Sequence, residues 1–236
     1  MRRQWSWLLA LIAALSGPAA AQPRHLGLVS YQEPVVPKLE IDAAAVVAFT
    51  IRANGRVADA VTLTATNRVL GDSAREAVLA WRFERDPTLG RGRDAEPSKV
   101  LRRELIEFVF KRDGIVTSMS HRDGAKSWFP ADYKPVVQLV QAAELEPPLA
   151  RLVQPQSAAP AELVRTLTVP GSVVVSYVVD ESGAVRVPIA ERGTEPALMD
   201  AAVALVAGWR FEPPARDGEP VLVEVRETVI FHPRSQ

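Results

Sequence analysis

The side chains that commonly catalyse reactions or bind metals are sparse in this sequence and follow no catalytic spacing. Cysteine is absent, which excludes disulfides, thiolate metal ligands and thiol catalysis. The three histidines, His25, His121 and His232, stand apart and lack metal-ligand spacing. No serine lies in a nucleophile-elbow motif, and no pair of carboxylates stands out. The sequence therefore predicts no enzyme and no cofactor or metal site.

Two groups of side chains, one of arginines and one of aromatic residues, could contact a ligand. The arginines could meet an acidic partner or lipid head groups, although a solvated face is the simpler interpretation. They are Arg82, Arg85, Arg91, Arg93, Arg102 and Arg103. Four aromatic side chains could stack on a ligand, but a large aromatic residue at a helix end beside a sheet usually fills the core. We expect a structural role for these four, which are Trp81, Phe83, Trp209 and Phe211.

The first residues have the pattern of an exported protein. Arg2-Arg3 is followed by the apolar run Trp5 to Leu15 and by the small residues Ala19-Ala20-Ala21. The apolar run is shorter than the roughly 20 residues that a membrane-spanning helix needs. We expect residues 1–21 to be a cleaved signal peptide and the mature protein to be periplasmic. An uncleaved signal that anchors the chain in the inner membrane is the alternative.

The overall composition is that of an ordinary globular protein. Hydrophobic residues make up 47% of the chain, and 28 basic residues balance 28 acidic ones. This balance gives no reason to expect a nucleic-acid partner or an anionic lipid surface. The chain after the signal peptide has a length that suits one large domain or two small ones.

One segment of the sequence occurs twice. Val46 to Glu84 matches Val174 to Glu212 at a constant offset of 128 residues, without a gap. The run Trp81-Arg82-Phe83-Glu84 thereby faces Trp209-Arg210-Phe211-Glu212. A shared four-residue run at a fixed offset is hard to obtain by chance, so we interpret the chain as one structural unit used twice.

Each copy predicts the order strand, turn, strand, helix, strand. Asn54-Gly55 and Ser182-Gly183 are hairpin turns between β-rich runs. A helix follows each hairpin, and Asp72 or Ser73 is the expected N-cap of the first. Apolar and polar residues alternate from Val221 to Phe231, as in a strand with one face on the core. The predicted fold class is α+β: two ββαβ modules, each a small antiparallel sheet with a helix packed on one face.

The repeat sets the expected domain boundaries. Residues 36–121 form the first module, which ends with a further hairpin at Asp113-Gly114, and residues 166–236 form the second. Prolines recur among Gln, Ala and Ser in residues 122–165, which predicts a partly extended linker with room for a short helix around residues 136–145. Few contacts should cross such a linker, so we expect independently folded modules.

The second copy resembles a known family. The residues that carry the resemblance are Val173 to Val179, Gly183, Val185, Asp200, Ala201-Ala202, Trp209-Arg210-Phe211-Glu212-Pro213, Gly218-Glu219-Pro220 and Val229-Ile230-Phe231. In this order they resemble the TonB C-terminal domain. The first copy has Arg85 where the second has Pro213, so its match is weaker. The resemblance implies that the last strand lies at the sheet edge, beside the first strand of its module.

The resemblance also implies a binding protein. In the family, the edge strand accepts a short extended segment of an outer-membrane receptor, and an inner-membrane anchor transmits force from a proton-driven motor. This chain has a cleavable signal in place of the anchor and lacks the long proline-rich spacer. We therefore expect pairing with an envelope protein, for which the resemblance implies a TonB-dependent outer-membrane receptor, and a link to transport.

The expected partner-binding residues lie on the last strand. They are Val221, Val223, Glu224, Val225, Arg226, Glu227 and Val229. In strand addition, main-chain hydrogen bonds supply affinity and alternate side chains supply register. Charges on an edge strand also protect it from aggregation. The alternative function is a structural one, in which edges pair within or between chains and form a self-associating periplasmic scaffold or homodimer without energy transduction.

Overall fold

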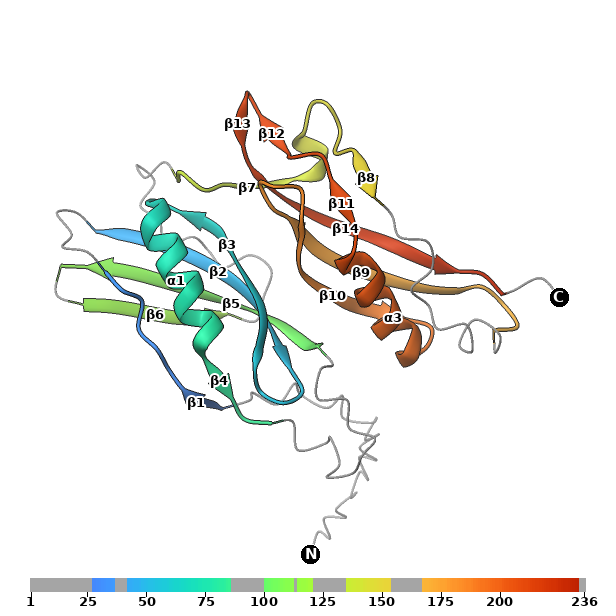
Figure 1. Cartoon of the computed structure of the whole chain (residues 1–236), viewed down its shortest axis with the longest axis horizontal. Helices are drawn as coiled ribbons and strands as arrows, with labels where there is room; N and C mark the ends of the chain where they lie inside the picture. Colours follow the sequence, from blue (N-terminus) through green and yellow to red (C-terminus); the bar gives the residue numbers. More distant parts are fainter. Residues whose placement is uncertain are drawn as a thin grey trace, which may run out of the picture.

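The structure is a computed structural model that describes residues 27–36, 42–85, 100–112, 114–120, 135–153 and 167–233. Within these ranges the protein has two four-stranded sheets and two α-helices, which confirms the predicted α+β class (Figure 1). We call residues 27–120 the first half and residues 135–233 the second half. The expected signal peptide, residues 1–21, lies outside the described residues.

The first half contains an antiparallel sheet with the strand order β3-β2-β5-β6. Its strands are β2 (Ala43–Arg52), β3 (Val57–Ala65), β5 (Val100–Lys111) and β6 (Gly114–Ser120). Helix α1 (Arg68–Ala80) packs on this sheet through its apolar face. Strand β6 pairs with β5 from Lys111 back to Leu105, so the further hairpin expected after β5 is present.

Helix α1 begins earlier than the sequence pattern indicates, and the expected N-cap at Asp72 or Ser73 is wrong. The side chain of Asn67 accepts a hydrogen bond from the Leu70 N–H at 3.2 Å and caps the helix. Gly71 lies in the first turns, where an added Cβ would stand 2.9 Å from the Cβ of Ala65. Glycine usually disfavours a helix interior, but here it allows the helix to approach β3 closely.

The second half contains a sheet with the strand order β10-β9-β14-β7. Its strands are β7 (Leu139–Gln141), β9 (Gly171–Val179), β10 (Val185–Gly193) and β14 (Leu222–Phe231). Strand β7 runs parallel to β14, whereas the other neighbours are antiparallel. Helix α3 (Pro196–Ala207) covers one face and starts with a proline, whose fixed φ suits the first helical position.

Shorter elements complete both halves. The short strand pairs are β1 (Leu28–Ser30) with β4 (Arg82–Phe83), β8 (Arg151–Val153) with β11 (Arg210–Phe211), and β12 (Ala215–Arg216) with β13 (Glu219–Pro220). A 3₁₀ helix, η1 (Ala142–Glu144), follows β7. Strands β7 and β8, which lie in the expected linker, thus pair with β14 and β11. The division into domains stays a prediction.

The residues that recur in the sequence have the same local geometry in both halves. Gly55 and Gly183 have φ angles of 79° and 81°. The Phe83 N–H donates to the Gly55 carbonyl at 2.8 Å, and the Phe211 N–H donates to the Gly183 carbonyl at 2.9 Å. A Cβ at either glycine would stand 2.0 Å from the phenylalanine carbonyl oxygen. Both turns therefore require glycine for its φ angle and for the close approach of the next strand.

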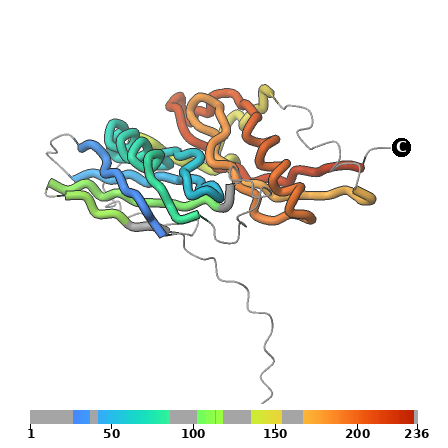
Figure 2. Tube along the Cα trace, turned by 60° about the horizontal axis from the view of Figure 1, so that its bottom comes forward, coloured from blue at the N-terminus to red at the C-terminus, as the bar shows by residue number. Residues whose placement is uncertain are grey.

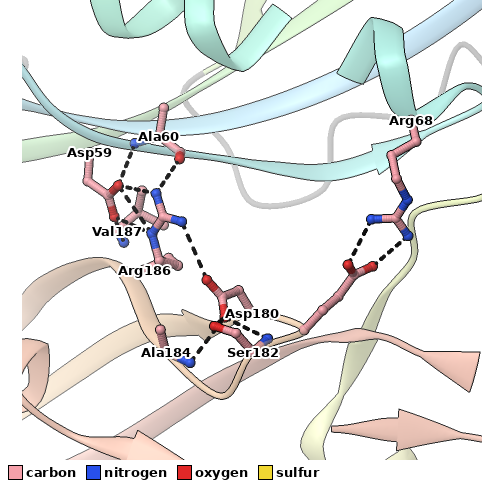
Figure 3. A network of polar contacts seen from close by, with 9 residues as sticks. Asp59, Ala60, Arg68, Asp180, Ser182, Ala184, Arg186 and Val187 are labelled. Atoms are coloured by element: carbon pink, nitrogen blue, oxygen red, sulfur yellow. Dashed lines mark hydrogen bonds and ion pairs between the residues drawn. The ribbon is translucent and has the colours of Figure 1, made fainter. Parts of the chain in front are cut away.

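The two halves lie side by side along the long axis and contact each other (Figures 1 and 2). On β3, the Asp59 carboxylate accepts hydrogen bonds from the Arg186 guanidinium and, at 2.9 Å, from the Val187 N–H (Figure 3). Arg68 forms an ion pair with Glu181 at 2.7 Å. The side chain of Val187 is fully buried in the apolar cluster of the first half. This is more contact than a flexible linker predicts.

Candidate functional site

Strand β14 has one side that is only partly paired. On its inner side it pairs with β9 from Val223 to Phe231 without a register shift. On its outer side β7 pairs only with the stretch from Leu222 to Glu224. No other described strand pairs with this side. We call residues 225–231 the open edge.

One hydrogen bond establishes which main-chain groups of β14 point outward. The Leu222 N–H donates to the Gln138 carbonyl at 2.9 Å, so this peptide group faces the β7 side. Peptide groups alternate in direction along a regular strand, so the N–H and C=O groups of Arg226, Thr228 and Ile230 also face outward. Those of the intervening residues face β9. The open edge thus presents a row of main-chain donors and acceptors.

The apolar residues expected to bind a partner lie mostly in the core. The side chains of Val221, Val223 and Val229 are buried in the cluster beneath α3. Val221 precedes β14, and Val225 is half-buried against the same cluster. These valines orient the strand. A partner at the edge would contact only a small part of their side chains.

The charged residues of β14 form ion pairs on both faces of the sheet. The pairs are Glu224 with Arg103, Arg226 with Glu191, and Glu227 with Arg151, at 3.5, 2.7 and 2.7 Å. Ion pairs of this kind hold long side chains over the sheet faces. The charges therefore do not by themselves block the row of outward main-chain groups.

An aromatic cluster anchors the face of β14 that lies under the helix. The Arg151 guanidinium carbon stands 3.7 Å from the centre of the Trp209 ring, within the range of a cation–π contact. Burial, with a smaller effect of the Glu227 charge, raises the pKa of Tyr177 above its ordinary value. Tyr177 is therefore neutral at physiological pH and acts as a core residue. Arg151 in turn fixes Glu227 and ties β8 to the sheet.

The corresponding strand of the first half is covered over a longer stretch, and among the described residues only its start, Val100 to Glu104, lacks a neighbour on the outer side. Strand β5 pairs with β2 on one side and with β6 on the other, from Leu105 to Lys111. The edge position implied for the last strand is therefore wrong for the first half. In the second half it holds only from Val225 onward, because β7 covers the start of β14.

The residues expected to bind a partner lie on β14 or directly before it, but they do not include all of its outward-facing groups. Thr228 and Ile230, whose peptide groups face outward, are absent from the expected set, as is the β7 segment. Alternation in a sequence separates two faces but does not say which peptide groups point to which neighbour. Only the hydrogen bond between Leu222 and Gln138 resolves this direction. Thr228 and Ile230 are both exposed.

No group of metal-ligating side chains occurs among the residues that the structure describes. None of the helices in the same ranges is long and apolar enough to cross a membrane.

The fold and the site define a mixed α+β protein in which the outer side of β14 is only partly paired among the described residues. Residues 162–233 match the family model of the Gram-negative bacterial TonB protein C-terminal. The match contains β9, β10, α3 and β14, and it does not extend to the first copy of the repeat. No curated protein and no solved structure matches the chain. The similarity therefore concerns the half of the molecule that carries the open edge.

Proposed function

We propose that this protein is a periplasmic TonB-like binding protein that pairs through the open edge with an extended segment of another envelope protein. The observation that carries the proposal is the outer side of β14 from Val225 to Phe231, beside which the structure describes no strand. It lies within the residues that resemble the TonB C-terminal family. The partner that this similarity favours is a TonB-dependent outer-membrane receptor, and the process is transport across that membrane.

Strand addition is the physical basis of the proposed binding. Three outward residues, Arg226, Thr228 and Ile230, each offer one N–H and one C=O group to an extended partner. Up to about six main-chain hydrogen bonds could form, each with a net contribution of roughly 0.5–1.5 kcal/mol. Most of this gain is offset by the ordering of the partner, so we expect a modest, reversible affinity.

The proposal includes no catalytic step. The family to which residues 162–233 are similar is a non-enzymatic family of energy transducers and binding domains. Periplasmic location follows from the pattern of residues 1–21, in which a short apolar run precedes a small-residue cleavage site. We expect the N-terminus of the mature protein to be Gln22.

Self-association is the second candidate function. The open edge is self-complementary in principle, because two copies of β14 could pair across a two-fold axis. The exposed side chain of Ile230, which is 56% accessible, would be covered in such a pair. The mass of the mature protein in solution separates this candidate from the first.

A pair of substitutions at Thr228 tests the proposed binding. Thr228→Pro removes an outward N–H group and leaves the hydrogen bonds to β9 in place. Thr228→Ala is the matched control, because it loses the hydroxyl but keeps the N–H. We expect both variants to melt near the wild-type temperature. In crosslinking from the envelope fraction, only the proline variant should capture less partner. Equal capture by all three proteins would exclude the open edge as the contact.

A further inference from the structure

Residues 135–141 join the two halves and hydrogen-bond to both sheets. We call this segment the strap. Near its start, the Val136 N–H donates to the carbonyl of Ala65, the last residue of β3, at 2.8 Å. Further along, the Gln138 carbonyl accepts from the Leu222 N–H at 2.9 Å, and β7 pairs with the start of β14. One short segment thus occupies positions beside the outer strand of each sheet.

The strap is anchored by buried side chains and by an arginine. Val137 packs in the apolar cluster of the first half, and Val140, which is 3% exposed, packs in that of the second. Arg216 donates to the Gln138 side chain at 2.7 Å and to the Glu144 carboxylate at 3.1 Å. These contacts hold β7 against β14 although the strand is short.

After Gln141 the chain leaves the sheet. The Gln141 N–H donates to the Glu144 carboxylate at 3.0 Å, which turns the chain into η1. Strand β7 therefore occupies the outer side of β14 up to Glu224. From Val225 onward, no described strand lies beside β14. An added strand that advanced toward Leu222 would collide with Gln141 and η1.

We propose that the strap is a fixed stop that ends the open edge at Glu224 and thereby sets the length and register of the bound segment. This inference rests on the proposed function of the open edge. The vacant place extends from Val225 to Phe231 and contains three outward-facing residues, so a segment of about six residues makes all the main-chain pairs that it offers. A longer partner gains no further main-chain pairs, because the stop lies at one end and the strand ends at the other.

The exposed face of the open edge indicates the side chains of the partner. Arg226, Thr228 and Ile230 project from the face opposite α3, and all three are exposed. Side chains that stand opposite each other on neighbouring strands interact. An apolar residue of the partner would cover Ile230, and a hydroxyl or carboxylate would meet the Arg226 guanidinium. The expected partner is a short, extended segment in which such residues occupy alternate positions.

Two valines of the strap offer a matched test in the full mature protein. Val140→Glu places a charge in the buried anchor, whereas Val136→Glu makes the same change at a side chain that is 53% exposed. The probes are synthetic peptides of alternating threonine and valine, with lengths from about four to about ten residues. The measurements are the affinity and the amide hydrogen exchange of β14 by NMR.

In the wild type we expect slow exchange at Leu222 and Glu224 without any peptide, and fast exchange at Arg226, Thr228 and Ile230. Peptides should slow only the latter three amides. Affinity should rise several-fold up to about six residues and then stay constant within about two-fold. In Val140→Glu the first two amides should exchange fast, and peptides of about eight residues should bind about ten-fold more tightly than those of six. Val136→Glu should behave like the wild type.

The outcomes separate the two proposals. If peptides bind but wild-type affinity keeps rising beyond about six residues, or Leu222 and Glu224 lose protection on binding, the strap is displaced and the stop is disproved. The proposed function then stands. If no peptide of any length protects the amides of Arg226, Thr228 and Ile230 in any of the three proteins, the open edge is not a binding edge and both proposals fail.

Discussion

The two halves of the molecule share a turn, a helix and a tryptophan at the helix end, yet their sheet edges differ. In the first half the chain continues past β5 into β6, which pairs with β5 from Leu105 to Lys111. In the second half β14 is the last described strand, and only the short β7 covers part of it. The repeated residues determine the local geometry around the glycine turn. The segments outside the repeat, β6 and β7, determine how much of each edge is open.

The contact between the halves joins equivalent positions of the repeat. Asp59 and Val187 are separated by the 128-residue offset, and the carboxylate of one accepts the N–H of the other at 2.9 Å. Equivalent residues meet in this way across the two-fold axis of a homodimer. Here the two positions carry different residues, so the contact is asymmetric. The first half supplies the acceptor, and the second supplies the apolar side chain.

The backbone conformation of Val187, in the second half, depends on contacts with the first half. Its φ angle of 45° is unfavourable for a β-branched residue, and the pairing of β10 with β9 shifts register at this place. Such a conformation persists where surrounding contacts stabilise it. The Asp59 carboxylate and the apolar cluster of the first half provide those contacts. The second half is thus held in this form partly by its neighbour.

The largest expected effect concerns the two tryptophans. Trp81→Ala and Trp209→Ala should each lower the free energy of unfolding by about 3–5 kcal/mol, because both side chains are buried, with 1% and 2% exposed. Trp81→Ala should cost more, since its indole N–H also donates to the Gln32 carbonyl at 2.9 Å. Urea unfolding measures the difference. A wild-type unfolding curve for either variant would contradict the core assignment.

The glycine turns should respond alike in the two halves. Gly55→Ala and Gly183→Ala should each lower the free energy of unfolding by about 2–4 kcal/mol, because a Cβ meets a carbonyl oxygen and φ is positive. Gly218→Ala is the control: its φ is 82°, but nothing lies within 4 Å of its Cβ. That variant should lose only about 1 kcal/mol. Unequal losses at the first two would show that the equivalent turns differ in strain.

The features that could be predicted from the sequence depend on neighbouring residues, and those that could not depend on distant ones. The Asn54-Gly55 turn carries a local signal, as does the alternation along β14. The strap carries no such signal: a short helix is expected around residues 136–145, whereas the structure has the three-residue strand β7 and the 3₁₀ turn η1 there. Its structure depends on Arg216 and on buried valines. The pairing of Asp59 with Val187 likewise arises only when the halves meet.

Asp59→Asn should loosen the contact between the halves. The substitution keeps the shape of the side chain but removes the charge that faces Arg186, whose pKa is raised chiefly by its hydrogen bonds to Asp59. We expect the free energy of unfolding to fall by about 1–3 kcal/mol and amide exchange around Val187 to accelerate. Arg68→Gln is the control at the exposed ion pair with Glu181, with an expected loss of under about 1 kcal/mol. Equal losses would mean that the Asp59 network has no special role.

The smallest expected effect separates the side chains that support the two equivalent turns. In the first half the Asn54 side chain accepts the Arg56 N–H at 3.0 Å, whereas in the second the Asp180 carboxylate accepts from the N–H groups of Ser182 and Ala184 at 2.9 and 3.0 Å. Burial raises the pKa of Asp180, but its hydrogen bonds together lower it below the ordinary value.

A depressed pKa in the folded state means that Asp180 stabilises the fold above the pKa of the unfolded chain, about 3.9, and that this contribution is lost as pH falls through the folded value. Between neutral pH and about pH 3, wild type should therefore lose on the order of 1 kcal/mol more than Asp180→Asn does. Asn54→Ala should keep the acid-induced loss of the wild type, because its amide does not titrate. Urea unfolding at both pH values measures these differences. If Asp180→Asn lost as much stability in acid as the wild type, the carboxylate charge would not stabilise the second turn. The two turns would then be stabilised by equivalent neutral hydrogen bonds.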